Sequence, residues 1–391
     1  MGNAGGRVWR RLLVIGEIPH HLDGRGRLCP PPGLAAQLDV WAGRFDEVRC
    51  CAVLADGPPP AGSAPYESTN VALVPLAPAG GQGLRAKLGV LRAMVGWQHI
   101  LRHEIAGADV VHIRAPSNIA LLAMPVAQAL RARRYAIYTA SWTGFHAEAV
   151  TYQIQRRWLG RWFGGIVHAY VPSGPSSRRR HVRSTFSPVL RAAQLDELGE
   201  RWVRSGDWSD RPIRIVCAGR FSDNKNQITL VRALAELQSR GLEVECRFIG
   251  EGDSESEVRR AAQDLDSVRF LGQVPLEEVY AAMSWADLNV LPSFGEGFPK
   301  VLLEGMAVGA LPIVSDIPMH RSMVSGRGWV FDPHDPAALA HQIEAASRIT
   351  SGERCSRIRS CSEYSRRHTM EAFGVEIDEV LERLRNDADR S

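Results

Sequence analysis

Short continuous apolar runs alternate along this chain with longer segments in which apolar residues recur at helical spacing. In the first half the apolar runs predict strands at residues 11–15, 48–54, 71–76, 109–113, 135–139 and 166–172. In the second half they predict strands within residues 213–219, 242–252, 268–271 and 287–292. Strands that alternate with helices over short connections are typical of parallel sheets covered on both faces. The pattern therefore predicts an α/β protein.

Two carboxylates flank the start of a predicted helix within residues 287–316, which read DLNVLPSFGEGFPKVLLEGMAVGALPIVSD. Glu296 lies in the turn after a strand, and Glu304 lies in a helix over residues 299–308, where proline occupies its favoured first position. A loop that enters a helix presents free N–H groups and the positive end of the helix dipole. This arrangement suits a polar or anionic ligand, which the two acids can contact at different points.

The E-G-F-P-x-x-x-x-E arrangement resembles the E-x7-E signature of retaining glycosyltransferases of the GT-B fold, in glycosyltransferase family four. In that family the first acid and the following amides hold the transferred sugar, and the second acid accepts both ribose hydroxyls of the nucleotide. The resemblance implies that Glu304 holds the ribose and that the sugar is held by Glu296, Gly297, Phe298 and Lys300. Many members have glycine where this chain has Pro299, which has no N–H to donate. The resemblance therefore does not predict which sugar is transferred. The alternative is an ordinary strand, loop and helix with surface acids.

A second segment places two cations on a strand-to-helix turn. Arg220 and Lys225 bracket the turn between the strand at residues 213–219 and a helix at residues 227–240. Two cations there can neutralise a diphosphate whose charge grows as the glycosidic bond breaks. This R-x4-K spacing resembles the family's diphosphate clamp, which implies that Arg220, Lys225 and Glu296 are the catalytic residues. The alternative is a solvated turn with ordinary surface charge.

Four candidate residues follow predicted strands in the second half of the chain. Ligands of parallel sheets bind beyond the carboxyl ends of the strands, and Arg220, Gly250, Gly272 and Glu296 all fall there. By resemblance, Gly272 and Val274 lie beside the nucleotide base. In the first half the acceptor-side candidates rest on weaker signals, namely a glycine turn and polar residues at strand ends: Gly26, His112, Arg114 and His146. For each lone histidine, a structural role is the alternative.

The length of 391 residues suits two domains of about 150 to 200 residues each. We expect a boundary between residues 196 and 212, with an N-terminal acceptor domain at 1–200 and a C-terminal donor domain at 201–365. The resemblance implies two Rossmann-like, doubly wound parallel-sheet domains facing across a cleft. It also implies that the final helix, within residues 366–391, crosses back to the first domain.

Charge is distributed unevenly between the halves. Residues 1–200 contain 23 Lys+Arg and 13 Asp+Glu, a net charge of +10, so the remaining 24 and 30 give −6 and the total is +4. Within the basic half, residues 155–163 read QRRWLGRWF, a mixture that suits an anionic membrane surface. The alternative is an amphipathic helix with core tryptophans. No nucleic acid partner is expected, because no recognised module accompanies the basic residues.

Targeting and metal-binding signals are weak throughout the chain. The apolar run at residues 12–15 is too short for a signal peptide, and seven cysteines without C-x-x-C spacing favour reduced thiols in the cytosol. We therefore expect a cytoplasmic protein, peripheral at the inner membrane face if the basic segment binds lipid. Asp264 and Asp266 form a D-x-D pattern, but it ends a charged helix instead of following a strand. We expect no metal and no cofactor.

The sequence thus predicts a retaining, metal-independent glycosyltransferase that uses a UDP- or GDP-linked sugar. Its acceptor is a hydroxyl of a glycan, a lipid-linked sugar or a small molecule, and the basic half favours cell-surface polysaccharide or glycolipid assembly. Two other classes share the motifs. One is a sugar-nucleotide epimerase or phosphorylase of the same fold, and the other is a non-catalytic nucleotide-sugar-binding partner at the membrane surface.

Overall fold

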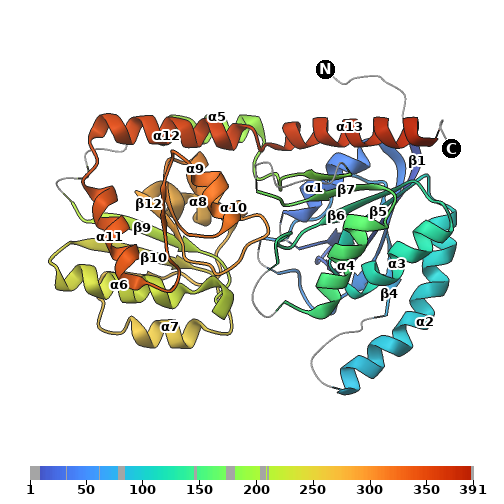
Figure 1. Ribbon diagram of the computed structural model, residues 1–391, viewed down its shortest axis with the longest axis horizontal. Helices are drawn as coiled ribbons and strands as arrows, with labels where there is room; N and C mark the ends of the chain where they lie inside the picture. Colours follow the sequence, from blue (N-terminus) through green and yellow to red (C-terminus); the bar gives the residue numbers. More distant parts are fainter. Residues whose placement is uncertain are drawn as a thin grey trace. The chain divides into compact units, whose positions relative to one another are not determined.

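The computed structural model describes residues 9–31, 33–60, 62–77, 84–144, 148–172, 181–202, 208 and 211–388. The chain forms two compact units. The first comprises Met1–Phe186 with Phe373–Ser391, and the second comprises Ser187–Ala372. Each unit is built around its own, predominantly parallel sheet (Figure 1).

The sheet of the first unit has the strand order β4-β3-β1-β5-β6-β7-β8, and its neighbouring strands are parallel. Their bounds are β1 Trp9–Leu22, β3 Phe45–Leu54, β4 Val71–Leu76, β5 Val110–Ala115, β6 Arg134–Tyr138, β7 Ile166–Ala169 and β8 Val182–Ser184. The short strand β2 (Leu28–Cys29) pairs antiparallel with the end of β1. The order reverses between β1 and β5, which is the switch point of a doubly wound sheet.

Helices cover both faces of this sheet (Figure 1). Side chains alternate along a strand, so Leu13 and Ile15 of β1 join one core cluster with α2 (Leu84–Ala106), α3 (Asn118–Ala129) and α4 (Val150–Arg161). The other face meets α1 (Leu34–Ala42), whose Trp41 ring centroid lies 4.9 Å from that of His112. It also meets α13 (Met370–Ala388), whose Glu376 Oε1 lies 2.6 Å from Nδ1 of His168.

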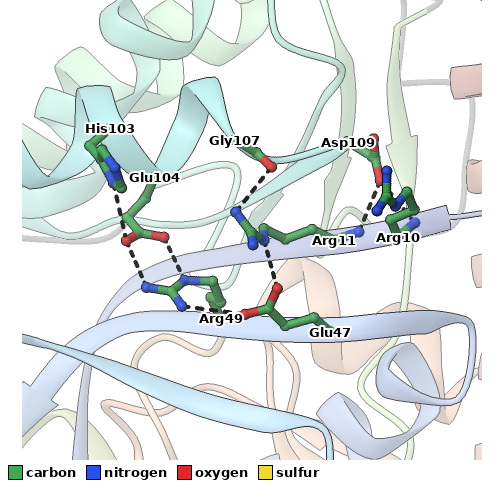
Figure 2. Close-up of polar contacts among 8 residues, drawn as sticks. All are labelled: Arg10, Arg11, Glu47, Arg49, His103, Glu104, Gly107 and Asp109. Atoms are coloured by element: carbon green, nitrogen blue, oxygen red, sulfur yellow. Dashed lines mark hydrogen bonds and ion pairs between the residues drawn. The ribbon is translucent and has the colours of Figure 1, made fainter.

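A polar network ties β1, β3 and α2 together away from the carboxyl ends of the strands. Figure 2 shows Arg49 between two acids, with its Nε 2.6 Å from Glu104 Oε2 on α2 and its Nη1 3.3 Å from Glu47 Oε1. The Nε of Arg11 lies 2.7 Å from Glu47, and Asp109 accepts the Arg11 backbone N–H at 2.9 Å. These contacts satisfy charged groups beside the core and leave the carboxyl edge of the sheet to other side chains.

The sheet of the second unit has the order β11-β10-β9-β12-β13-β14, and all its neighbouring pairs are parallel. Its strands are β9 Ile213–Ala218, β10 Val244–Ile249, β11 Val268–Phe270, β12 Leu288–Leu291, β13 Leu311–Ser315 and β14 Trp329–Phe331. Numbered along this unit, the order is 3-2-1-4-5-6, the arrangement of a Rossmann sheet. Its switch point lies between β9 and β12. The predicted α/β class with two doubly wound parallel sheets is confirmed.

Two groups of helices pack around this second sheet. One consists of α6 (Gln227–Ser239), α7 (Glu255–Ala261) and α11 (Pro336–Ser347). The other consists of α5 (Ala192–Trp202), α8 (Leu276–Trp285), α9 (Lys300–Ala307) and α12 (Ser351–Arg366), while α10 (Pro318–Val324) packs on β13 and β14. Among helices of the described part of the chain, none is long and apolar enough to span a bilayer.

Several boundaries differ from the predictions. The first unit ends at Phe186, ahead of the range 196–212, because α5 packs on α9 and α12 of the second unit. The chain returns to the first unit at Phe373, where Arg44 Nε lies 2.5 Å from Asp378 Oδ1 of α13. The strand predicted at residues 166–172 ends at Ala169 and is followed by β8, and the charged helix predicted before the D-x-D pattern is α7, which already ends at Ala261.

Candidate functional site

Two loops meet at the switch point of the second sheet. The first leads from β9 through a short 3-10 helix (Asp223–Lys225) into α6, and the second leads from β12 into α9. Backbone N–H of Phe294 donates to the Asn224 carbonyl at 2.8 Å, and the Asn224 side chain donates to the Gly295 carbonyl at 2.8 Å. Asn226, in a left-handed conformation at φ 53°, donates to the Pro292 carbonyl at 3.1 Å. The two loops therefore behave as one bonded unit.

This bonding brings a predicted cation and a predicted acid into contact. Lys225 Nζ lies 2.6 Å from Oε1 of Glu296, and the two side chains are 28% and 11% exposed. Ser293 Oγ donates to the same carboxylate oxygen at 2.7 Å. The pair is thus largely withdrawn from water. Its charges are therefore screened less than those of an ion pair at the surface.

Arg220 lies on the same loop, but its side chain has a different partner. Its Nη2 lies 2.9 Å from Asp253 Oδ2, and both side chains are mostly exposed, at 70% and 83%. Gln227 donates to the Arg220 carbonyl at 3.0 Å and so fixes the backbone beneath the guanidinium. An exposed ion pair contributes little stability, so this guanidinium can exchange Asp253 for another anion at low cost.

Glu304 lies in α9, beyond the Lys225–Glu296 pair in sequence, and is partly buried. Burial raises the pKa of its carboxyl, while the charge of Lys300 acts in the opposite direction. Within the described ranges no residue donates a hydrogen bond to this carboxylate. A desolvated carboxylate of this kind gains from hydroxyl donors, because hydrogen bonds favour its charged form.

The remaining predicted donor residues surround the start of α9 and the end of β11. The helix begins at Lys300, and Pro299 is its N-cap, one residue outside the predicted start. The Phe298 ring centroid lies 5.9 Å from that of His368. Gly272 has a φ of 68°, and its carbonyl accepts the Gly250 N–H at 2.8 Å. Val274 packs on the apolar cluster of the second sheet.

A histidine absent from the predictions lies beside this site. His320 of α10 is fully buried, and its Nδ1 lies 3.1 Å from Ser315 Oγ at the end of β13. Ser315 Oγ in turn donates to the carbonyl of Ser293 at 2.5 Å. Burial lowers the pKa of His320 to about 4, so the ring is neutral near pH 7. The available sequence signal was its position five residues after a strand end, which is weak by itself.

The acceptor-side candidates of the first unit are not gathered in one place. His112 is 1% exposed and packs between the rings of Trp41 and Tyr135, so it lies in the core instead of at the strand end. Gly26, with a φ of 74°, lies in the exposed turn between β1 and β2, where its N–H donates to the Asp23 carbonyl at 2.9 Å. His146 lies outside the described residues.

Arg114 differs from these in its chemistry. It is the last polar residue of β5, at the switch point of the first sheet, and its Cβ lies 3.2 Å from the position a Cβ would take at Gly16. Burial lowers the pKa of its guanidinium, with Tyr170 and Tyr135 acting in the opposite direction. It forms no ion pair with a carboxylate of the described residues. Among the acceptor-side candidates, Arg114 is the one best placed to contact an anionic group.

Comparison with solved structures gives the fold class of the chain. Sucrose-phosphate synthase from Thermosynechococcus elongatus aligns with a TM-score of 0.66 at 18% identity, over 97% of this chain and 100% of the other. Anabaena HepE in complex with UDP and glucose aligns with a TM-score of 0.66 at 15% identity, over 95% and 99%. At these identities the likeness is one of fold, and the fold is GT-B.

Sequence comparison then relates part of the chain to a family. The family described as "Glycosyl transferases group 1" matches residues 212–348, which include Arg220, Lys225, Glu296 and Glu304. A phosphatidyl-myo-inositol mannosyltransferase of Mycolicibacterium smegmatis is 30% identical over 254 residues, 59% of this chain and 61% of that protein. The amylovoran biosynthesis glycosyltransferase AmsK of Erwinia amylovora is 34% identical over 157 residues, 37% of each chain. The chain thus spans less than two thirds of these relatives. Residues 212–348 thus match the group 1 glycosyltransferases, and the fold of the chain is GT-B.

Proposed function

We propose that this protein transfers a sugar from a nucleotide diphosphate sugar to a hydroxyl acceptor, with retention of configuration and without a metal ion. The observation that carries the proposal is the Lys225–Glu296 contact of 2.6 Å at the switch point of the second sheet. Ligands of Rossmann sheets bind at that point. Because Arg220 shares the Lys225 loop and Glu304 follows Glu296 in the next helix, one bound donor can meet all four side chains.

The donor is proposed to bind with its ribose on Glu304 and its sugar near Glu296. The Glu304 carboxylate is desolvated and can accept hydrogen bonds from two ribose hydroxyls. Glu296 and the loop leading to Lys300 are proposed to contact the sugar. Gly272 and Val274, after β11, are proposed to lie beside the base, which we propose to be uracil or guanine. A hydrogen bond from a hydroxyl to a buried carboxylate is stronger than a hydrogen bond between two neutral groups, because the acceptor is charged.

Departure of the nucleoside diphosphate is proposed to limit the reaction, and the two cations are proposed to stabilise it. Negative charge grows on the leaving oxygen, and Lys225 and Arg220 supply preorganised positive charge. Lys225 would turn from Glu296 to the diphosphate, and Arg220 would exchange Asp253 for it. The acceptor hydroxyl then attacks the same face of an oxocarbenium-like sugar and gives its proton to the departing diphosphate oxygen, which gives retention without a protein nucleophile.

A product assay separates this function from its rivals. Purified protein is mixed with a panel of UDP- and GDP-linked sugars, with and without candidate acceptors, and release of nucleoside diphosphate is measured. A transferase releases it only when an acceptor hydroxyl is present. Change of the nucleotide sugar without acceptor would indicate an epimerase, and release driven by inorganic phosphate would indicate a phosphorylase. Binding without turnover under every condition would indicate a non-catalytic partner.

The acceptor is proposed to bind to the first unit and to be a glycan, a lipid-linked sugar or a small molecule. Support comes from the charge of this half, +10 over residues 1–200, which favours an acidic partner. The names of the relatives point to polysaccharide and glycolipid assembly. Arg114 at the carboxyl end of β5 is the residue we expect the acceptor to approach.

One exposed helical face supports a membrane-surface location for a cytoplasmic protein. Val150 and Ile154 of α4 are 68% and 42% exposed, and Trp162 after the helix is 57% exposed. Arg157 and Arg161 are exposed at helical spacing from Ile154. By contrast, Phe163 is fully buried, so part of the segment at residues 155–163 packs in the core. Apolar groups beside arginines suit the headgroup region of an anionic bilayer.

Vesicle flotation tests this location. We expect binding to vesicles that contain phosphatidylglycerol and little binding to pure phosphatidylcholine, with salt weakening the interaction. The double variant Arg157→Glu with Arg161→Glu should lose most binding. The matched control, Arg260→Glu with Arg269→Glu, changes the same net charge at exposed positions of the second unit. Equal losses for both variants would show that only overall charge matters.

A further inference from the structure

Arg114 carries a guanidinium that has no protein partner within the described part of the chain. Its backbone carbonyl accepts from Ser117 Oγ at 3.3 Å, but its side chain forms neither a hydrogen bond nor an ion pair there. The residue is only partly buried, and its side-chain nitrogens are not fully covered, in contrast to the two unpaired ring nitrogens of His112. The guanidinium therefore reaches solvent. A permanent cation with five N–H donors seldom stays unpaired when it is partly desolvated.

The described groups that act most strongly on this guanidinium are neutral at pH 7. They are the phenols of Tyr170, Tyr135 and Tyr66 and the thiol of Cys50. Burial raises the pKa of the Cys50 thiol to about 12, and it also raises the pKa values of Tyr135 and Tyr66. An unperturbed phenol has a pKa of about 10, far above 7. The positive charge of Arg114 is thus left without a compensating charge in its own surroundings.

The carboxylate of Glu17, which follows Gly16 at the same edge of the sheet, is engaged elsewhere. A Cβ at Gly16 would lie 3.2 Å from the Cβ of Arg114, so the two backbones are close neighbours. The two oxygens of Glu17 nevertheless accept from the backbone N–H and the side-chain amide of Asn118, at 3.0 and 3.2 Å. They satisfy the start of α3 and leave the guanidinium to an external anion.

The hydroxyl of Tyr66 is also committed to another partner. His20 Nδ1 lies 3.1 Å from the Ile18 carbonyl, which can only accept, so Nδ1 carries the proton. Burial lowers the pKa of His20, so the ring is neutral, and its Nε2 accepts the Tyr66 hydroxyl at 2.7 Å. Neither side chain can therefore donate to an anion beside Arg114. The guanidinium is the donor that this cluster offers.

We infer that the Arg114 guanidinium binds a singly charged oxyanion of the acceptor, a carboxylate or a phosphodiester, and thereby selects anionic acceptors over neutral ones. The inference rests on the proposed function, in which the acceptor binds to the first unit. Arg114 ends β5 at the switch point of its sheet, where ligands of such sheets bind. One guanidinium balances one negative charge, and its planar fork matches two oxygens of either group. A neutral acceptor would leave this cation unpaired and would be rejected for that reason.

Three substitutions separate binding from structure. Arg114→Met keeps a long side chain without the charge, and Arg114→Lys keeps the charge without the fork. Arg102→Met is the matched control, at an exposed position of α2 in the same unit. Because removal of an unpaired, partly buried charge should not cost stability, we expect the melting temperature of Arg114→Met to equal or exceed that of Arg102→Met. A clear decrease would show that the guanidinium stabilises the fold and would contradict the inference.

Chemical modification tests whether the guanidinium is open to a ligand. Phenylglyoxal condenses with accessible guanidinium groups, and peptide mass spectrometry measures the rate at each arginine. We expect Arg114 to react in the free protein and to react several-fold more slowly with glucuronate or dimethyl phosphate than with sodium chloride at the same ionic strength. Arg102 should react equally in all three. Absence of reaction at Arg114, or of protection by both anions, would overturn the inference.

Turnover with paired acceptors measures the selectivity. Each pair consists of a neutral glycoside and the same glycoside with a carboxylate or a methyl phosphodiester. We expect the wild type to use a charged member with the lower KM, and Arg114→Met to raise that KM about 10- to 100-fold. The KM for the nucleotide sugar and the use of the neutral member should not change, and Arg114→Lys should recover part of the loss. Preference for the carboxylate indicates a sugar acid, and preference for the phosphodiester indicates a phosphate-linked acceptor.

Two kinetic results would contradict the inference. One is a wild-type preference for the neutral member of every pair, and the other is an equal loss by Arg114→Met on charged and neutral members. Absence of transfer to any acceptor, together with protection of Arg114 by the two anions, would instead remove the proposed function and leave the anion site in place.

Discussion

At the scale of single residues, the ion pair between Lys225 and Glu296 is the contact that a diphosphate would compete for. The carboxylate also accepts from Ser293, so it keeps a donor when the ammonium turns away. Arg220 would reach the same ligand by leaving its exposed ion pair with Asp253, which costs little to break. The two cations therefore start from different partners: Lys225 from a largely buried ion pair with Glu296, and Arg220 from an exposed ion pair with Asp253.

We predict that Lys225→Ala lowers turnover by about 100- to 1000-fold, as for other preorganised charges that act in the transition state. The measurement is the steady-state rate with saturating nucleotide sugar and acceptor. Arg232→Ala, an exposed cation further along α6, is the control and should retain the normal rate. A purified, folded Lys225 variant with a normal rate would remove this residue from the mechanism.

Glu304→Gln should weaken nucleotide binding by about 10- to 100-fold, because two hydroxyls would lose a charged acceptor. Isothermal calorimetry with the nucleoside diphosphate measures the effect directly. Glu363→Gln on the exposed side of α12 removes the same charge elsewhere in the unit and should have no effect. Unchanged affinity in the Glu304 variant would contradict the ribose contact.

The buried His320 should also make stability depend on pH. Burial lowers its pKa to about 4 from 6.5, so the unfolded chain takes up its proton first as the pH falls. The contribution of the neutral ring to the free energy of unfolding is therefore present above pH 6.5 and is lost as the pH falls toward 4. About 2 kcal/mol is lost between pH 7 and pH 5. We expect the melting temperature of His320→Asn to fall less over that interval than that of the wild type. Parallel pH profiles would show that the histidine is not buried in its neutral form.

At the scale of secondary-structure elements, close packing of α9 on β12 holds Glu304 in position. A Cβ on Gly305 would lie 2.3 Å from Asn289 Nδ2, and that amide donates to the Val301 carbonyl of the same helix at 2.9 Å. Only a residue without a side chain allows this approach. The glycine after Glu304 is thus a packing requirement of the site.

We predict that Gly305→Ala destabilises the protein by about 1 to 3 kcal/mol through overpacking and also weakens nucleotide binding, because α9 must shift. Gly352→Ala is the matched control, since a Cβ there meets no atom within 4 Å and alanine favours a helix by about 0.5 to 1 kcal/mol. Denaturant melts of the two variants should therefore move in opposite directions. Equal stability of both would contradict the packing argument.

At the scale of the whole molecule, the chain leaves the first unit at Ser187 and returns to it at Phe373. The returning residues bury an apolar face within the first unit, formed by Phe373, Ile377, Val380, Leu381 and Leu384. Each such side chain contributes about 1.5 to 3 kcal/mol when fully buried. The first unit is thus completed by the last segment of the sequence.

Truncation after Ala372 should destabilise the first unit and leave nucleotide binding by the second unit intact. Hydrogen exchange followed by mass spectrometry measures this, with loss of protection expected in β1, β5 and β7 and retained in β9 and β12. The point variants Ile377→Ala and Val375→Ala provide a milder pair, since Ile377 is 1% exposed and Val375 is 61% exposed. Only the first should reduce protection. Uniform loss across both units would contradict their separate cores.

Most of the fold could be predicted from the sequence because strands and helices depend on nearby residues. The runs that predicted β9 and β12, and the spacing that predicted α6, are local patterns, and the structure confirms those elements within about two residues. Boundaries were less accurate where packing decides them. The boundary predicted between residues 196 and 212 begins inside α5, yet this helix belongs to the second unit because α9 and α12 lie beside it.

By itself the sequence determined the α/β class, the placement of Glu296 and Glu304 around a helix start, and the strand-to-helix turn that carries Arg220 and Lys225. Only the tertiary structure decided that Lys225 instead of Arg220 pairs with Glu296, that His112 packs in the core, and that His320 joins the site. The physical reason is that these contacts join residues from different strands. Their side chains meet only through the order of the strands in the sheet and the hydrogen bonds between the loops that follow them.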